Sequence, residues 1–256
     1  MFYICIIYLL SLSISSANKI IGIKNVYKSF PVTNKLLFSI DNRKTKYALK
    51  NINIELGTIT TFIGPSKSGK STLAKCIIGM EPVDQGELVL NTPDTTKVIT
   101  TEISNKLLKS CGYLDHLYSL SYDSDRTVGE IITKYRSNNL LTDSIINIVN
   151  IPLNEKINNL LESQKILFEL MLVLIKIVNT NSNNDEYTPI IVMDEYLDKV
   201  IPSVRSKFYK TLQALIANIP MKIIIITHSK SVLQEITEKI VVIKVLTLYY
   251  ISHNNY

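Results

Sequence analysis

The stretch from Gly64 to Thr72 (GPSKSGKST) constrains the fold of this chain more than any other feature of its sequence. It matches the pattern G-x-x-x-x-G-K-[ST], which binds phosphate where it joins a strand to a helix. The β-branched run Thr58–Ile63 precedes it and favours a strand, and Lys70–Met80 contains no helix breaker before Gly79. This context predicts a phosphate-binding loop rather than an ordinary glycine-rich turn.

The loop residues have distinct predicted tasks. Main-chain N–H groups of such a loop point at phosphate oxygens, and the N-terminus of the following helix adds a partial positive charge. Lys70 is predicted to reach the β- and γ-phosphates, and the hydroxyl of Ser71 is predicted to bind Mg²⁺. The predicted nucleotide-binding residues of the loop are Gly64, Pro65, Ser66, Lys67, Ser68, Gly69, Lys70, Ser71 and Thr72.

A second apolar run, Ile190–Met193, leads directly into Asp194 and Glu195. Ligands of open parallel sheets bind outside the carboxyl ends of the strands, which is where these two side chains would lie. Asp194 is predicted to hold Mg²⁺, directly or through water, and Glu195 to polarise an attacking water. By itself the pattern has a structural interpretation too, because apolar strands often end in an acidic residue.

A third apolar run, Ile223–Ile226, leads into Thr227 and His228. A lone histidine is more often structural than catalytic. Here it follows a strand that should end at the same edge as the other two, and this placement favours a functional role.

Strands alternate with helices along the chain, and two of the strands are near-continuous apolar runs. This pattern is typical of an α/β fold whose parallel sheet is covered on both faces. Strands are expected at 20–27, 48–56, 58–63, 87–90, 189–193 and 222–227, and helices at 70–80, 166–177 and 202–218. Residues 239–251 are expected to form strand, without a glycine-bearing hairpin.

Composition excludes several classes of protein. The 256 residues are 46% hydrophobic and 20% charged, which excludes a disordered chain. The three cysteines have no C-x-x-C spacing, so a structural zinc site is not expected. The net charge of +6 comes without clustered arginines or interleaved aromatic residues, so no nucleic-acid partner is expected.

Residues 1–18 differ from the rest of the chain. An apolar run, Phe2–Leu10, is followed by a serine-rich stretch, and no charge precedes Lys19. The pattern resembles a secretory signal peptide that lacks its positive N-terminal region. A targeting leader and a mis-started gene are therefore both open interpretations, and the rest of the chain, 19–256, forms the expected domain.

The phosphate loop, the Asp-Glu strand and the Thr-His strand, in this order and spacing, resemble the ATP-binding domain of ABC transporters. The resemblance covers about residues 20–245 and includes the segments 46–57 and 78–87 on either side of the loop. It implies a P-loop NTPase core with a mainly parallel sheet, an antiparallel β subdomain and an inserted helical subdomain at about 112–175.

The resemblance also implies roles for individual residues. Phe30 takes the place of the aromatic residue that stacks on adenine, Glu195 that of the general base, and His228 that of the residue that contacts the γ-phosphate. The implied cofactors are ATP and Mg²⁺, with Ser71 and Asp194 as the metal-binding residues.

Several family motifs are altered in this sequence. The signature Leu-Ser-Gly-Gly-Gln falls on residues 160–164, where its serine and both glycines are replaced and Glu162 brings negative charge. His116 stands at the usual glutamine and Ile201 at the usual inter-subunit aspartate, although Asp198 is nearby. Lys67 occupies a position with positive φ in the family, where strain of about 1–2 kcal/mol is expected.

The groups that bind nucleotide within one chain are thus retained, and the groups offered to a partner's nucleotide are altered. This asymmetry predicts an ATP-binding and ATP-hydrolysing subunit of an ABC transporter that works with a separate membrane subunit and a non-identical ATPase partner. It is expected at the cytosolic face of a membrane, or in a plastid-like organelle if the leader functions. The alternative is a catalytically weak nucleotide-binding interaction module.

Overall fold

This computed structural model of the protein describes residues 19–34, 39–91, 96–97, 111–115, 125–135, 140–181, 189–200, 202–219, 221–229, 232, 239–244 and 247–251. The expected leader (residues 1–18), His116 and Ile201 lie outside the described residues.

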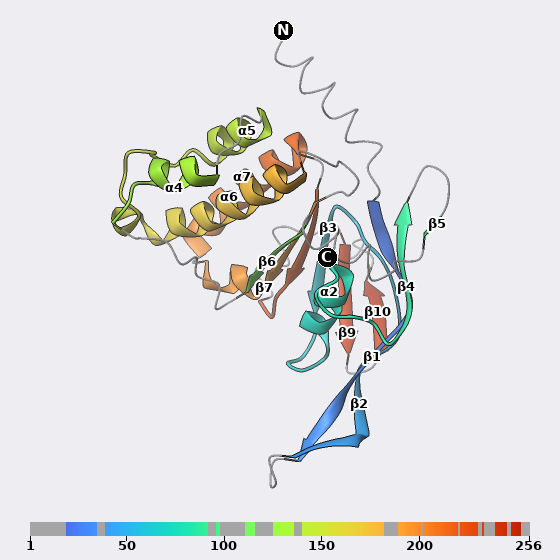
Figure 1. Cartoon of the computed structure of the whole chain (residues 1–256). Helices are drawn as coiled ribbons and strands as arrows, with labels where there is room; N and C mark the ends of the chain where they lie inside the picture. The colour runs from blue at the N-terminus through green and yellow to red at the C-terminus, as the bar shows by residue number, and fades with distance from the viewer. Residues whose placement is uncertain are drawn as a thin grey trace.

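A six-stranded sheet forms the centre of the molecule, with the strand order β10-β9-β3-β8-β7-β6 (Figure 1). The strands are β3 (Ile59–Ile63), β6 (Cys111–Asp115), β7 (Ile190–Asp194), β8 (Lys222–Ile226), β9 (Lys239–Lys244) and β10 (Thr247–Ile251). All adjacent pairs are parallel except β9 and β10. The prediction of a mainly parallel sheet is confirmed.

Both faces of this sheet are buried. Because side chains alternate between faces along a strand, Ile190 and Val192 of β7 pack into one hydrophobic cluster, and Ile191 and Met193 pack into the other. The apolar runs without polar alternation follow from this arrangement, since neither face of the strand meets water.

A second, antiparallel sheet has the strand order β2-β1-β4-β5. Its strands are β1 (Lys19–Asn34), β2 (Ser39–Glu55), β4 (Gln85–Asn91) and β5 (Thr96–Lys97). The β1–β2 pair is longer than expected and projects from the body of the molecule (Figure 1). Its register shifts after Ile23, Val26, Lys28 and Pro31 interrupt the alternation by which the full length of the strands would be recognised.

The first helix in the described part of the chain, α2 (Lys70–Ile77), lies between the two sheets. Leu73 of this helix packs in one cluster with Ile23 and Ile52 of the antiparallel sheet and with Phe62 and Ile224 of the central sheet. The helix ends three residues earlier than expected, because Gly79 adopts a φ of 78° and the chain turns back there.

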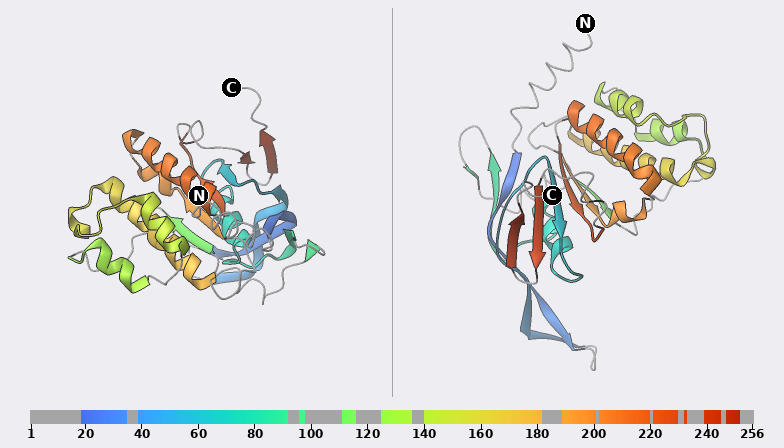
Figure 2. Two further views of the ribbon diagram at one scale, coloured as in Figure 1. Left: turned by 90° about the horizontal axis from the view of Figure 1, so that it is seen from above. Right: turned by 180° about the vertical axis from the view of Figure 1, so that it is seen from behind.

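The remaining helices gather on the other side of the central sheet (Figure 2). They are α4 (Val128–Tyr135), α5 (Leu140–Val149), α6 (Glu162–Asn181) and α7 (Pro202–Asn218), with short 3₁₀ helices η1 (Ile157–Asn159) and η2 (Tyr196–Lys199). The expected bounds of α7 match those observed. No helix in the described part of the chain is long and apolar enough to cross a bilayer.

Two segments differ from the expectation. Residues 111–115 form the edge strand β6, and the next helix in the described part of the chain begins at Val128. The strand expected over 239–251 is present as two strands, because β9 and β10 pair antiparallel with Lys244 opposite Thr247. The absence of glycine removed the usual signal for a hairpin.

Candidate active site

Three strand ends meet at one edge of the central sheet. In the parallel register Phe62 of β3 pairs with Ile226 of β8, and Ile226 pairs with Asp194 of β7. The phosphate loop, Glu195 and Thr227 directly follow these positions and therefore leave the sheet at the same edge. The structure brings together the three motifs that the sequence singles out.

The phosphate loop has the backbone that its sequence requires. Gly69 precedes α2 with a φ of 97°, and a Cβ there would lie 2.6 Å from the carbonyl oxygen of Ala48. Lys67 has a φ of 62°, the conformation in which a side chain is strained. The loop therefore adopts a positive φ at position 67 even though the residue there is a lysine and not a glycine.

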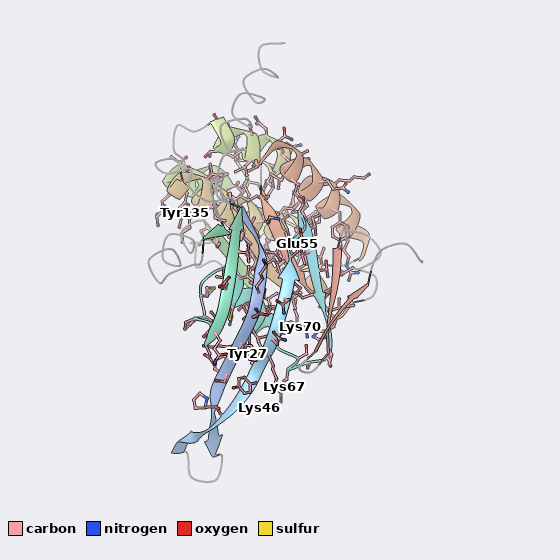
Figure 3. The ribbon with its side chains drawn as sticks, turned by 90° about the vertical axis from the view of Figure 1, so that its right-hand side faces the viewer. Tyr27, Lys46, Glu55, Lys67, Lys70 and Tyr135 are labelled. Atoms are coloured by element: carbon pink, nitrogen blue, oxygen red, sulfur yellow. The ribbon has the colours of Figure 1, made fainter. Side chains whose placement is uncertain are left out.

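Lys70 points back into the loop. Its Nζ donates hydrogen bonds to the carbonyl oxygens of Gly64, at 3.0 Å, and Pro65, at 2.9 Å. Burial lowers the pKa of the Lys70 ammonium, and the carboxylates of Glu195 and Asp194 act in the opposite direction. The hydrogen bonds thus hold the Lys70 side chain inside the loop, where a bound phosphate would lie. Figure 3 labels Lys67 and Lys70 together with Tyr27 and Lys46 of the antiparallel sheet.

The oxygen donors at this edge suit Mg²⁺. Ser71 is the second residue of α2 and is half-buried, and Asp194 is 8% exposed. The buried hydroxyl of Ser68 has no hydrogen-bond partner among the described residues. No cluster of three or more His, Cys, Asp or Glu side chains able to hold a metal occurs among the described residues. Mg²⁺ is commonly held by one or two protein oxygens together with the phosphates of its nucleotide, so Ser71 and Asp194 are the residues that could hold it.

The carboxylate of Asp194 has a partner that sequence reasoning missed. The hydroxyl of Tyr113, from the neighbouring strand β6, donates a hydrogen bond to Asp194 Oδ2. Burial raises the pKa of Tyr113, and the hydrogen bond to Asp194 raises it further. The hydroxyl therefore stays protonated and holds one carboxylate oxygen.

Glu195 and His228 are in direct contact. His228 Nε2 lies 2.9 Å from Glu195 Oε1. Glu195 has a φ of 54° directly after β7, and its N–H donates to the carbonyl oxygen of Ile226 at 2.9 Å. The two residues predicted to be catalytic, 33 positions apart in the sequence, thus form one pair next to the phosphate loop.

Phe30 lies on β1, away from the three strand ends in the sequence. The residue is 38% exposed, and Lys28 Nζ lies 5.0 Å from the ring centroid. The preceding residue is fixed by Asp84, whose Oδ2 accepts hydrogen bonds from the N–H of Ser29 at 2.7 Å and from its hydroxyl at 2.6 Å. An exposed, anchored aromatic ring is available for stacking, and the contact with adenine stays a prediction.

In the segment at the family signature, residues 160–164, polar side chains contact groups of the same helix end. The N–H of Leu161 donates to Gln164 Oε1 at 2.9 Å, and Lys165 Nζ lies 3.9 Å from Glu162 Oε2. Leu161 is 68% exposed, the largest value among the exposed large hydrophobic residues described. This end of α6 therefore presents an apolar side chain and a carboxylate.

The comparison with known protein families matches residues 49–181 to the ABC transporter family. The chain belongs to this family. The match covers slightly more than half of the 256 residues, and it includes the phosphate loop and the segment at the signature. The predicted ABC-transporter ATP-binding domain is confirmed.

Curated relatives carry related names. The chain is 24% identical over 233 residues to the methionine import ATP-binding protein MetN of Haemophilus ducreyi, covering 87% of this chain and 62% of MetN. It is 36% identical over 89 residues to the glutamine transport ATP-binding protein GlnQ of Escherichia coli, covering 35% of this chain and 31% of GlnQ. The chain thus spans about six tenths of the length of the MetN relatives.

Solved structures share the fold. The dimeric ABC transporter cassette MJ0796 superposes with a TM-score of 0.59 at 20% identity, covering 90% of this chain and 97% of the cassette. Clostridium perfringens cbiO1, part of the ABC transporter complex cbiONQ, gives a TM-score of 0.62 at 17% identity, covering 91% and 89%. The predicted P-loop NTPase fold class is confirmed, and the roles of single site residues stay predictions.

Proposed function

We propose that this chain binds and hydrolyses ATP to power an ABC transporter. The single observation that carries this proposal is the contact of Glu195 with His228 at the edge where the phosphate loop begins. A domain that only bound nucleotide would not need a carboxylate paired with an imidazole at this position. The names of the relatives, which include methionine and glutamine transport ATP-binding proteins, support a role in transport.

In the proposed reaction, Glu195 accepts a proton from the attacking water as the water oxygen bonds to the γ-phosphorus. The bond from this phosphorus to the bridging oxygen breaks, and the ammonium of Lys70 stabilises the charge on the leaving phosphate. His228, beside Glu195, orients the γ-phosphate and the water. Mg²⁺, held by Ser71 and Asp194, would neutralise charge on the β- and γ-phosphates.

We further propose that the working assembly contains a non-identical ATPase partner. Glu162 at the start of α6 would bring negative charge towards a triphosphate bound by the other subunit, which is repulsive. A partner with an intact signature would complete the site of this chain, whereas the reciprocal site would bind ATP and hydrolyse it slowly. A separate membrane subunit would place the domain at the cytosolic face, or in an organelle if the leader functions.

The test is ATP hydrolysis by the purified chain, alone and mixed with a cassette that has an intact signature, such as one from a MetN relative, in which the partner's own general-base glutamate is replaced by glutamine so that the partner cannot hydrolyse ATP by itself. We expect turnover only in the mixture, lost in Glu195→Gln and kept in Glu87→Gln, an exposed carboxylate on β4. Turnover by the chain alone that Glu195→Gln abolishes would contradict the non-identical partner. An absence of saturable, Mg²⁺-dependent ATP binding would contradict the function itself.

The alternative is a nucleotide-binding interaction module without turnover. Glu162 and the exposed Leu161 favour it, because neither suits a phosphate contact across an interface. The same experiment separates the two functions. The module predicts Mg²⁺-dependent ATP binding with no hydrolysis in any mixture, and the retained Glu195–His228 pair argues against it.

A further inference from the structure

Glu195 and His228 come from two different loops, so their contact depends on how those loops are held together. Glu195 follows β7 and leads into the 3₁₀ helix η2, whereas His228 lies two residues beyond β8. Both side chains are more than a third exposed. Packing around the side chains themselves therefore does little to fix their distance.

Asp198 of η2 connects the two loops. Its Oδ1 accepts a hydrogen bond of 2.6 Å from the hydroxyl of Thr227, and its Oδ2 lies 3.5 Å from the main-chain nitrogen of His228. On the other side, the N–H of Asp198 donates to the carbonyl oxygen of Glu195 at 3.2 Å. One residue thus contacts the backbone of both members of the pair.

Thr227 makes this connection rigid. It is completely buried, and its Oγ1 also accepts a hydrogen bond of 2.9 Å from the N–H of Ser229. Its own N–H donates to the carbonyl oxygen of Phe62, the penultimate residue of β3. The short bond to Asp198 is of the charge-assisted kind, which is stronger than a bond between neutral groups.

These contacts change the interpretation of Asp198. The sequence leaves open that Asp198 replaces the inter-subunit aspartate of the family, for which Ile201 now stands in the ungapped alignment. The structure turns both carboxylate oxygens of Asp198 towards the same chain. This side chain therefore acts within its own site.

We propose that Asp198 is a positioning residue that holds the loop of His228 against Glu195 through the hydroxyl of Thr227. For hydrolysis this inference rests on the proposed function. The positioning itself exists without nucleotide and can be measured separately.

The decisive measurement is the ring signal of His228 in NMR spectra of the nucleotide-free full chain. The chain has only three histidines, so a His228→Gln variant assigns the signal. Glu195→Ala defines the signal position when the imidazole has lost its carboxylate. We expect Asp198→Ala and Thr227→Val to move the signal at least halfway to that position.

Two matched variants keep the proposal falsifiable. Thr227→Ser retains the hydroxyl and should leave the signal in place, and Glu87→Gln removes an exposed carboxylate elsewhere. The proposal is overturned if Asp198→Ala leaves the His228 signal at its wild-type position while Glu195→Ala moves it. It is also overturned if Thr227→Ser shifts the signal as far as Thr227→Val does.

Nucleotide titration then separates this inference from the proposed function. With Mg²⁺ and a fluorescent ATP analogue, Asp198→Ala should bind within twofold of wild type, because Asp198 contacts neither the loop nor Asp194 in the contacts described. A tenfold loss of affinity would mean that Asp198 acts on nucleotide binding and would overturn its role as a positioning residue. Failure of the wild type to bind the analogue would overturn the proposed function and leave the NMR result standing.

Discussion

The N-termini of α2 and α6 show how one type of structure serves two opposite purposes (Figure 1). The first turn of α2 contains no acidic residue, and no side chain caps it, so its N–H groups remain available to a phosphate. The first turn of α6 contains Glu162, and Gln164 caps the N–H of Leu161. The comparison teaches that α2 leaves its first N–H donors open to an anion, whereas α6 places a carboxylate and a capping side chain at the equivalent position.

The largest effect is expected from the α2 side of this comparison. Lys70→Ala should weaken Mg²⁺-dependent ATP binding by about 100-fold, because a charged hydrogen-bond donor is worth up to about 3 kcal/mol. Titration with a fluorescent ATP analogue measures the loss. Lys50→Ala, which removes an exposed lysine from β2, serves as the control and should bind like wild type. Equal binding by both variants would show that the loop does not hold the nucleotide.

At the N-terminus of α6, restoring the family signature should strengthen ATP-dependent dimer formation. In a Glu195→Gln background, Leu161→Ser with Glu162→Gly and Ser163→Gly should allow ATP-dependent self-association, which light scattering detects. Removing one repulsive charge near the triphosphate is worth about 2 kcal/mol, or roughly a 30-fold tighter dimer. Repeating the measurement with ADP is the control. An ATP-dependent dimer with the native signature would contradict the comparison.

The carboxylate of Asp194, the predicted Mg²⁺ ligand, sharpens the comparison further. Tyr113→Phe removes the hydroxyl that holds Asp194 Oδ2, so the carboxylate loses a fixed orientation. We expect the Mg²⁺-dependent part of ATP affinity to fall about fivefold, near 1 kcal/mol, and the affinity without Mg²⁺ to stay unchanged. Isothermal titration with and without Mg²⁺ measures both. A uniform loss in both conditions would indicate a purely structural role for Tyr113.

Cys76 of α2, the helix that follows the phosphate loop, should make the free energy of unfolding depend on pH. Burial raises the pKa of the Cys76 thiol to about 12, so the unfolded chain loses this proton at lower pH than the folded chain does. The contribution is therefore fully present below about pH 9 and is lost as pH rises towards 12. Between pH 8 and 10 the free energy of unfolding should fall by about 1 kcal/mol more than in Cys76→Ala. Equal pH slopes in denaturant titrations would contradict this.

The smallest effect is expected at the strained loop position. Lys67→Gly relieves a positive φ that costs about 1–2 kcal/mol but adds the glycine entropy cost of about 0.5–1 kcal/mol. The net gain should be about 0.5 kcal/mol, which thermal unfolding would register as a rise of roughly 1–2 °C. Lys24→Gly, at an exposed strand position, should destabilise the chain. A loss of stability in Lys67→Gly would show that the lysine side chain makes a compensating contact.

The sequence was sufficient where neighbouring residues carried the signal. The loop between β3 and α2, the two carboxylates at the end of β7 and the bounds of α7 each depend on a local pattern, and the structure places each segment in the expected position along the chain. The contacts of Tyr113 with Asp194 and of Asp198 with Thr227 join residues 81 and 29 positions apart. No local sequence pattern predicts these two contacts, because they depend on which strands are neighbours and on the turn that η2 makes.

By itself, the order of residues determined which side chains are available for phosphate chemistry and that they follow parallel strands, because backbone sterics and burial act over short segments. Only the tertiary structure decided which of these side chains touch. Strand order and register set those distances, and a hydrogen bond forms or fails within a few tenths of an ångström. The pairing of Glu195 with His228, and the carboxylate of Asp198 that connects their loops, belong to this second kind of information.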